Sequence, residues 1–227
     1  MSSESINSAF PDLWVEQAAY PALMPRSSED VMGVVQWCRD HGMRIFPVGS
    51  GHSLGEKFAV PNGVVSMISL ARDGVSEPDT HDLAIEVEAG VPAVLLHQLV
   101  HDAGLRLDGW PESYPGTVGG LFAGARGLEL RHLVLGMDII DGRGRSLRFG
   151  GRVRKNVSGF DVPGVMIGSR GMLGWIDRLY LKLNPGGSPL LDRRVPTPLG
   201  QITSPKGLYQ RVAVSLDPDG VFLKPGE

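Results

Sequence analysis

MRIFPVGSGHSLG, residues 43–55, carries a short apolar strand directly into a glycine loop. The residues before it, 24–42, have apolar positions at helical spacing, and Ser27 with Asp30 forms a capping pair at the start. In a P-loop or Rossmann unit the glycine loop would open a long helix. Here Pro61 soon interrupts the chain, so the loop belongs to another kind of fold.

The following segments add strands and a second helix. Residues 64–70 and 83–88 are typical of strands, and a helix with Val94, Leu95, Leu99 and Val100 on its apolar face is expected from Pro92 to Gly104. The order of these elements predicts an α+β fold with mixed strands.

A hairpin and one long strand complete this pattern. MDIID and SLRFG flank a turn at residues 142–145, and residues 174–183 alternate apolar and polar positions as in a strand. After Pro185 the chain is rich in Pro, Gly and Ser and is typical of a linker, with one regular segment at 208–216.

The composition excludes several classes of protein. Of 227 residues 42% are hydrophobic, and the net charge of −3 gives no general attraction to nucleic acid. The single cysteine, Cys38, excludes an internal disulfide framework and any iron–sulfur cluster built from several thiolates of this chain. No apolar run is long enough to span a bilayer, and the first residues lack the pattern of a signal peptide. A cytoplasmic location is expected, either free or peripheral to the inner membrane through partners.

The loop VGSGHS, residues 48–53, is a candidate anion site. Two glycines and a serine after a strand allow successive backbone N–H groups to point into one concavity, where they can bind a diphosphate. An ordinary glycine turn is the simpler explanation of this loop taken alone.

Four separated stretches together resemble one family. They are FPVGSGHSLG (46–55), PGTVGGLFAGA (115–125), VLGMDIIDGRGRSLRFGGRVRKNVSGFDVPGVMIGSRGMLG (134–174) and LDPDGVFLKPG (216–226). The chain resembles the FAD-linked oxidases of the vanillyl-alcohol oxidase/PCMH family, and within it the FAD-binding E subunit of bacterial glycolate oxidase. The resemblance implies a PCMH-type fold of two α/β subdomains with FAD between them.

The resemblance also implies which residues bind FAD, with no metal required. The first loop would hold the diphosphate through the backbone of Val48, Gly49, Ser50, Gly51, His52 and Ser53. The second wall would follow the ribityl chain and diphosphate and consist of Pro115, Gly116, Thr117, Gly119, Gly120, Gly124 and Ala125.

Two further motifs of the family lie in the third stretch. Its K-N-V-x-G-[YF]-D pattern is matched by Lys155, Asn156, Gly159 and Asp161. Its G-S-x-G-x-L-G-x-[IL] run is matched by Gly168, Ser169, Gly171, Leu173, Gly174 and Ile176. One requirement explains why glycine occupies these positions, because a bulky side chain there would push the dinucleotide away.

His52 leaves a choice open. In the related sugar-lactone and alditol oxidases a histidine of a G-x-x-H-S loop is bonded covalently to the flavin, whereas glycolate-oxidase E subunits usually lack this histidine. A histidine that only hydrogen-bonds within the loop is the alternative.

Three other groups have simpler explanations beside the functional ones. His97 and His101 have zinc-ligand spacing on one expected helix, but no third ligand is evident, so surface histidines are expected. Trp175 flanks a flavin-site segment, and burial in the core is its default. A basic run could attract an acidic substrate or partner, or form a solvated hairpin; it comprises Arg143, Arg145, Arg148, Arg152, Arg154 and Lys155.

The domain organisation follows from the resemblance. We expect an N-terminal arm at 1–21, an FAD-binding domain at 22–185 with subdomains at about 22–70 and 71–185, and a linker with the family's tail at 186–227. Family members insert a cap domain before this tail, whereas here about 30 residues join the two. The tail ends in LKPG where relatives tend to have N-P-G, which puts the contact of that asparagine in doubt.

The resemblance implies an FAD-binding subunit or module of a flavin-dependent oxidoreductase that oxidises glycolate or a related 2-hydroxy acid. A second flavin subunit and an iron–sulfur subunit would be its partners, and no residue of this chain is assigned a catalytic role. Two alternatives stay open. One is a stand-alone small oxidase with covalent flavin that acts on a sugar alcohol or lactone, and the other is a non-catalytic flavin-binding or assembly module.

Overall fold

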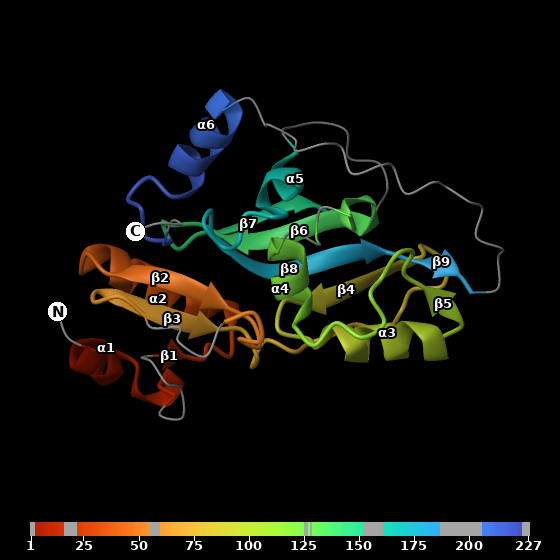
Figure 1. The fold of residues 1–227 in the computed structure, drawn as a ribbon, viewed down its shortest axis with the longest axis horizontal. Coiled ribbons are helices and arrows are strands. Elements are labelled where there is room, and N and C mark those ends of the chain that lie inside the picture. The colour runs from red at the N-terminus through yellow and green to blue at the C-terminus, as the bar shows by residue number, and fades with distance from the viewer. Residues whose placement is uncertain are drawn as a thin grey trace.

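The computed structural model describes residues 3–15, 22–54, 60–124, 127, 129–151, 161–186 and 206–223. It places the two larger sheets side by side along the long axis (Figure 1), and a further small sheet pairs the two-residue strands β5 and β9. The helices are α1 (Ser3–Ala9), α2 (Ser28–Asp40), α3 (Ala93–Asp102), α4 (Val118–Ala123), α5 (Val162–Met166) and α6 (Lys206–Leu216). The strands are β1 (Ala22–Leu23), β2 (Arg44–Val48), β3 (Val64–Ile68), β4 (Ala84–Glu88), β5 (Leu105–Arg106), β6 (Val134–Ile140), β7 (Ser146–Gly150), β8 (Trp175–Lys182) and β9 (Asn184–Pro185).

The N-terminal sheet is parallel, with the strand order β1-β3-β2. Helix α2 packs on it through Val31, Val34, Val35 and Cys38, which are all fully buried. Ile6 of α1 joins the same core. This sheet therefore has its own apolar core, formed by a face that the helical spacing of α2 predicted.

The start of α2 confirms the capping pair. The Ser27 hydroxyl accepts from the Asp30 N–H at 3.1 Å, and the Asp30 carboxylate accepts from the Ser27 N–H at 3.0 Å. This is a capping box, which satisfies two backbone donors that a helix start otherwise leaves without a partner.

The Cys38 thiol is expected to be unreactive in the folded protein. Its side chain is fully buried, and burial raises the pKa of the thiol to about 12. The thiolate is the reactive form, so a disulfide reagent such as DTNB should modify Cys38 at mildly alkaline pH only after urea unfolds the chain. Rapid modification of the native protein would contradict this burial.

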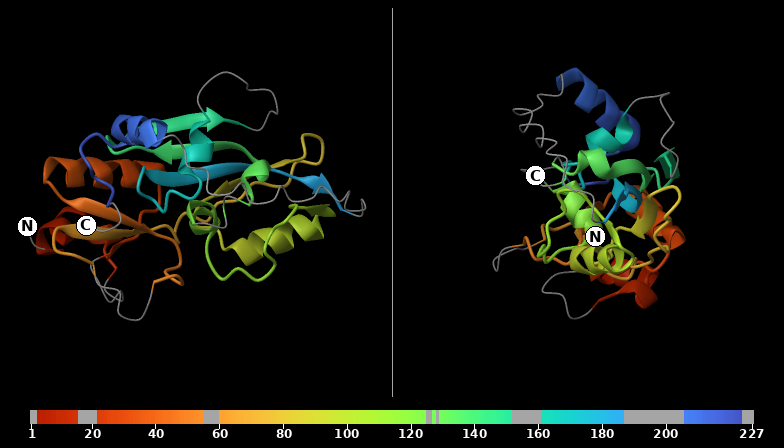
Figure 2. Two further views of the ribbon diagram at one scale, coloured as in Figure 1. Left: turned by 45° about the horizontal axis from the view of Figure 1, so that its top comes forward. Right: turned by 90° about the vertical axis from the view of Figure 1, so that its right-hand side faces the viewer.

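The second sheet is antiparallel, with the order β4-β8-β6-β7. It confirms the expected hairpin, in which β6 and β7 pair from Ile140 with Ser146 to Gly136 with Gly150. The long strand expected at residues 174–183 is present as β8, but its burial does not alternate, because β8 lies between β4 and β6 and is buried at nearly every position. A central strand covered on both faces needs apolar residues on both. Figure 2 shows α3 and α4 along one side of this sheet.

Helix α3 presents a different face from the one expected. Ala93, Leu96 and Val100 are buried, whereas Val94 and Leu95 are 46% and 56% exposed. Positions 93, 96 and 100 lie on one side of a helix that starts directly after Pro92, and that side faces the sheet.

The chain's last described segment closes the edge of the parallel sheet. Phe222 is fully buried and pairs with Ile45 of β2, whose N–H donates to the Val221 carbonyl at 2.6 Å. The carboxylate of Asp217 accepts from the N–H groups of Val221 and Phe222 at 2.8 and 3.0 Å. The tail thus covers a strand edge that would otherwise offer unpaired backbone groups.

A buried ionic network joins the two sheets. Arg72 follows β3, and its guanidinium lies 2.8 Å from Glu88 of β4 and 3.1 Å from Asp177 of β8. Ser28, at the start of α2, donates to Asp177 at 2.8 Å, and Arg178 pairs with Glu88 at 3.1 Å. No sequence pattern predicted this network, because its members are up to 149 positions apart.

Part of the basic run is neutralised within the hairpin. Arg145 pairs with the fully buried Asp141 at 2.7 Å, and Arg148 pairs with Asp138 at 2.7 Å. Tyr180 also donates to Asp138 at 3.0 Å, and burial is the main cause that raises the pKa of Tyr180 to about 12. These pairs support the interpretation of Arg145 and Arg148 as part of a solvated hairpin. Three other members of the basic run, Arg152, Arg154 and Lys155, lie outside the described residues.

Candidate functional site

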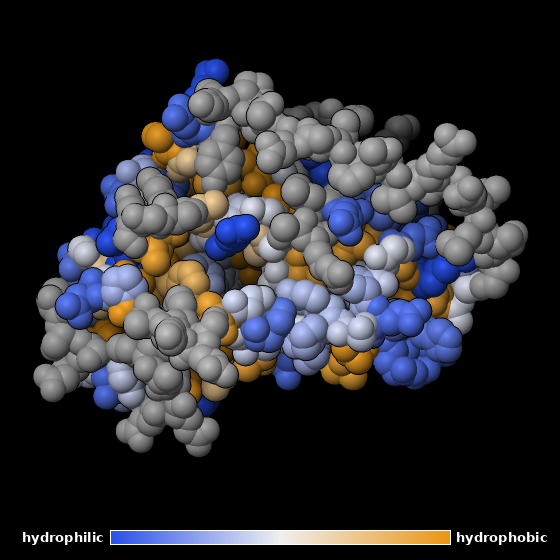
Figure 3. All heavy atoms as spheres, viewed as in Figure 1, coloured by the Kyte–Doolittle hydropathy of each residue, from blue (hydrophilic) through white to orange (hydrophobic). Residues whose placement is uncertain are grey.

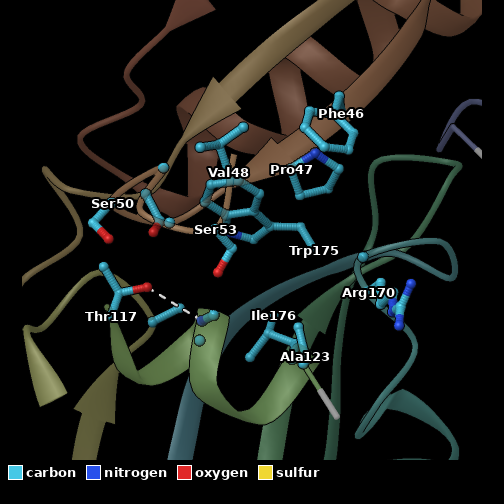
Figure 4. A pocket seen from close by; sticks show the side chains of 18 of the residues that line it. Phe46, Pro47, Val48, Ser50, Ser53, Thr117, Ala123, Arg170, Trp175 and Ile176 are labelled. Carbon is cyan, nitrogen blue, oxygen red and sulfur yellow. Dashed lines mark hydrogen bonds between the residues drawn. The ribbon is translucent and has the colours of Figure 1, made fainter. Parts of the chain in front are cut away.

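A cavity of about 650 Å³ lies between the two sheets, and this volume is within the range of about 300–1,000 Å³ that is typical of small-molecule and cofactor sites. Its walls come from the loop after β2, the residue after β4, helix α4 and the loop that leads into β8. Figure 3 shows the surface hollowed near the middle of one face, and Figure 4 shows the lining side chains.

The first wall is the glycine loop that follows β2. Val48, Gly49 and the residues through Ser53, which the family resemblance assigns to the diphosphate, all line the cavity. Within the described part of the chain, the backbone N–H groups of residues 50–53 donate to no protein acceptor. Gly51 has a φ of 76°, a conformation that glycine adopts readily. A turn with several free N–H groups beside a cavity can receive an anion.

The second wall is the start of α4. Thr117 caps this helix by accepting from the Gly120 N–H at 3.2 Å, and both residues line the cavity with Gly119 and Gly124. A Cβ on Gly49 would lie 2.5 Å from the Thr117 hydroxyl. The first two walls therefore meet so closely that the first can carry only glycine at this point.

The third wall is the loop into β8, which contributes Gly171, Gly174 and Ile176. A Cβ on Gly171 would lie 3.0 Å from the ring of Pro47, so this loop packs directly on β2. Trp175 also lines the cavity, is 2% exposed, and its indole N–H has no hydrogen-bond partner among the described residues. The position of the indole was not assigned to the site from sequence.

Other expected residues lie beside the cavity rather than on its wall. Gly116 backs His52, since a Cβ there would lie 2.6 Å from the imidazole. Gly168 donates to the Phe122 carbonyl at 2.9 Å and Ser169 is 3% exposed, so they support the third wall from behind. Asp161 caps α5 and pairs with Arg131. Pro115 precedes the second wall, and the expected residues outside the described part are Ala125, Lys155, Asn156 and Gly159.

Several lining residues were missed because the fold brings them to the cavity from other elements. Ser69 and Ala89 stand just after β3 and β4, and Leu223 belongs to the tail that pairs with β2. The remaining ones, apart from Tyr114, lie within the stretches that carry the family resemblance but were not assigned to the site: Phe46, Pro47, Leu54, Tyr114, Ala123, Arg170 and Met172.

His52 lies at the exposed side of this cavity. Its Nδ1 is 3.3 Å from the Ser50 hydroxyl and its Nε2 is 3.1 Å from the Ser53 hydroxyl. The ring of Tyr114 meets the imidazole edge to face, with 4.9 Å between the centroids. The loop thus holds the imidazole in contact with the second wall, where a bound ligand can reach it.

The charge on the walls suits an anionic ligand. Among the described lining residues Arg170 carries a permanent charge, and no aspartate or glutamate lines the cavity. His97 and His101 lie on α3 away from it, and the described residues contain no group of three or more potential metal ligands.

These features fit the FAD that the family resemblance implies. The N–H groups of the first loop, which have no acceptor among the described residues, match a diphosphate, and the crowded glycines allow a close approach. No helix of the described residues is both long and apolar enough to cross a membrane.

Comparison with known sequences agrees with this geometry. The model of the FAD binding domain family matches residues 21–150. Glycolate oxidase subunit GlcD of Bacillus subtilis is 28% identical over 171 residues, which cover 72% of this chain and 36% of that protein. Glycolate oxidase subunit GlcE of Escherichia coli is 37% identical over 121 residues, or 49% and 35% of the two chains. A D-lactate dehydrogenase of Archaeoglobus fulgidus is 27% identical over 197 residues, or 83% and 44%.

The chain spans between 35% and 44% of the length of these relatives. Among solved structures, an alkyldihydroxyacetonephosphate synthase superposes with a TM-score of 0.61 at 20% identity, over 75% of this chain and 33% of that one. This likeness establishes the fold, and it confirms the expected PCMH-type arrangement of α and β elements. By its sequence match, its fold and its glycine-lined cavity, the chain belongs to the FAD binding domain family.

Proposed function

We propose that the cavity between the two sheets binds FAD and that the chain is the FAD-binding module of an oxidoreductase acting on glycolate or a related 2-hydroxy acid. The observation that carries the proposal is the convergence of three glycine-rich segments on one cavity, with free backbone N–H groups in the first of them. The FAD binding domain match supports the cofactor, and the glycolate oxidase subunits and D-lactate dehydrogenase among the relatives support the substrate class.

The residues of the chain bind and orient the cofactor. Residues 50–53 donate their N–H groups to the diphosphate, and Thr117 holds the start of α4 against the same loop. Trp175 and Ile176, both buried, exclude water from the cavity floor. When bound, the flavin of FAD supplies the capacity to accept a hydride from a 2-hydroxy acid.

Partner proteins complete this proposal. Cys38 is the single cysteine of these 227 residues and is buried, so a cluster held by several cysteines is not built from them. A second flavin subunit and an iron–sulfur subunit are the proposed partners, as in an assembly that contains subunits like GlcD and GlcE.

The proposed domain boundaries follow the two sheets. Residues 22–70 form the first subdomain around the parallel sheet, and residues 71–185 form the second around the antiparallel sheet. Residues 1–21 are the arm, and residues 186–227 are a linker with a tail. Two apolar clusters, one around each sheet, support this division, and Ile140 and Trp175 of the second sheet also pack in the first cluster.

The visible spectrum of the purified chain, taken before and after acid precipitation, tests the central proposal. We expect a flavin absorbance band that moves into the supernatant on precipitation, because the walls described here bind through hydrogen bonds and packing. The next step is anaerobic addition of glycolate or D-lactate, with bleaching of the band as the sign of substrate oxidation. A colourless chain that also fails to bind added FAD would refute the proposal.

His52 supports a second candidate, a stand-alone oxidase of a sugar alcohol or lactone with covalently bound flavin. The imidazole lines the cavity and is held by Ser50 and Ser53, so it is within reach of the cofactor. In this case the absorbance stays in the precipitate, and His52→Ala releases it.

A further inference from the structure

Arg170 has an unusual backbone conformation beside the cavity. Its φ is 55°, in the left-handed region that residues other than glycine rarely adopt. Figure 4 shows Arg170 on the loop before β8, at the edge of the group of lining side chains. Strained conformations of this kind persist where the surrounding structure holds them, and they are concentrated at binding and catalytic sites.

The surrounding contacts explain how this conformation is held. The Arg170 N–H donates to the Ala123 carbonyl at 2.8 Å, and the Gly168 N–H donates to the Phe122 carbonyl at 2.9 Å. Gly171 packs against Pro47 in β2. The loop therefore bridges the end of α4 and the strand that leads into the anion-binding turn, and it fixes Arg170 between these two walls.

The side chain of Arg170 is exposed and makes no hydrogen bond or ion pair with the rest of the described protein. It differs in this from the arginines of the hairpin and of the buried network, which face carboxylates. No carboxylate lines the cavity beside it among the described residues. A strained, unpaired arginine at the edge of a cavity without acids is suited to an anion that arrives with the ligand.

We propose that Arg170 pairs with the diphosphate of bound FAD, so that this cation adds to the N–H groups of the glycine loop. The inference rests on the proposed function. The diphosphate carries the negative charge of FAD, and a guanidinium matches phosphate oxygens in geometry and charge. Arg170 and residues 48–53 line the same cavity, with Arg170 across the group of lining side chains from Ser50 in Figure 4, so its exposed guanidinium would approach the bound ligand from the side opposite the glycine loop.

Arg170→Asn tests the pairing, because asparagine removes the charge and tolerates the left-handed region. Flavin fluorescence titrations of the full chain should show about tenfold weaker binding of FAD, as expected for one lost charged hydrogen bond, and unchanged binding of riboflavin, which has no phosphate. Arg170→Lys should retain most of the affinity. The dissociation constant of the wild-type chain for FAD should rise more steeply with KCl than that of Arg170→Asn.

Arg143→Asn is the matched control, since Arg143 is an exposed arginine that does not line the cavity. Equal affinity of Arg170→Asn and the wild-type chain for FAD overturns the inference, and so does an equal loss for FAD and riboflavin, which would indicate a purely structural role. An intact FAD affinity with a raised KM for the acid substrate also overturns it and assigns Arg170 to the substrate. Failure of the wild-type chain to bind FAD refutes the proposed function instead.

Discussion

Replacing Arg72 with methionine is expected to lower the free energy of unfolding by about 3–5 kcal/mol, the cost of breaking a buried ion pair by removing one partner. The side chains of Arg72 and Asp177 are 6% and 5% exposed, and that of Glu88 is 14% exposed. Without the guanidinium, the Asp177 carboxylate still accepts a hydrogen bond from Ser28. It no longer has a positively charged partner in Arg72, although it is buried from water. Urea unfolding followed by tryptophan fluorescence measures the change.

The matched control is Arg39→Met on the surface of α2. Arg39 and its partner Asp40 are 33% and 60% exposed, so this pair is worth about 0–1 kcal/mol. The double variant Arg72→Met/Asp177→Asn should be more stable than the sum of the single effects predicts, because it leaves no unpaired charge at position 177. If Arg72→Met were as stable as Arg39→Met, the network would not join the sheets in the way described.

The second large effect is expected for Gly49→Ala, which should weaken FAD binding by about tenfold to a hundredfold. The added methyl group would lie 2.5 Å from the Thr117 hydroxyl, so the first two walls must separate. Such overpacking costs about 1–3 kcal/mol, and each 1.4 kcal/mol or so is tenfold in affinity. The displaced loop would then present its N–H groups to the diphosphate in the wrong place. Titration of the apoprotein with FAD gives the dissociation constants.

Two further variants make this result specific. Gly151→Ala is a matched control, because a Cβ there meets no atom within 4 Å. Thr117→Ala in the Gly49→Ala background removes the oxygen that clashes and should recover part of the affinity, although it also removes the cap of α4. Unchanged FAD affinity in Gly49→Ala alone would show that the walls can separate freely.

The sequence predicted the elements whose signals are local. The capping box at Ser27 and Asp30 and the apolar spacing of α2 depend on residues a few positions apart, and both were found in the structure. The same holds for the hairpin of β6 and β7. Most of the glycine positions named from motifs line one cavity, although their assignment to FAD contacts is still a prediction.

Sequence patterns misjudged features that depend on neighbours distant in sequence. The face of α3 was wrong at Val94 and Leu95, because the helix starts after Pro92 and the position of the sheet decides which side is buried. The strand β8 was expected to alternate, but pairing with β4 and β6 makes it central. Trp175 is buried in the core as expected, and the folded arrangement adds that it also lines the cavity.

By itself, the sequence determined the family of this protein, its local elements and the glycine segments in which a bulky side chain would block a ligand. It could do so because caps, turns and glycine motifs are set by interactions between residues that are close in the chain. Only the tertiary structure decided that these segments meet at one cavity, that Arg72 joins the two larger sheets and that Arg170 stands at the cavity edge without a partner among the described residues. Those properties arise from burial and charge pairing between residues that folding alone brings together.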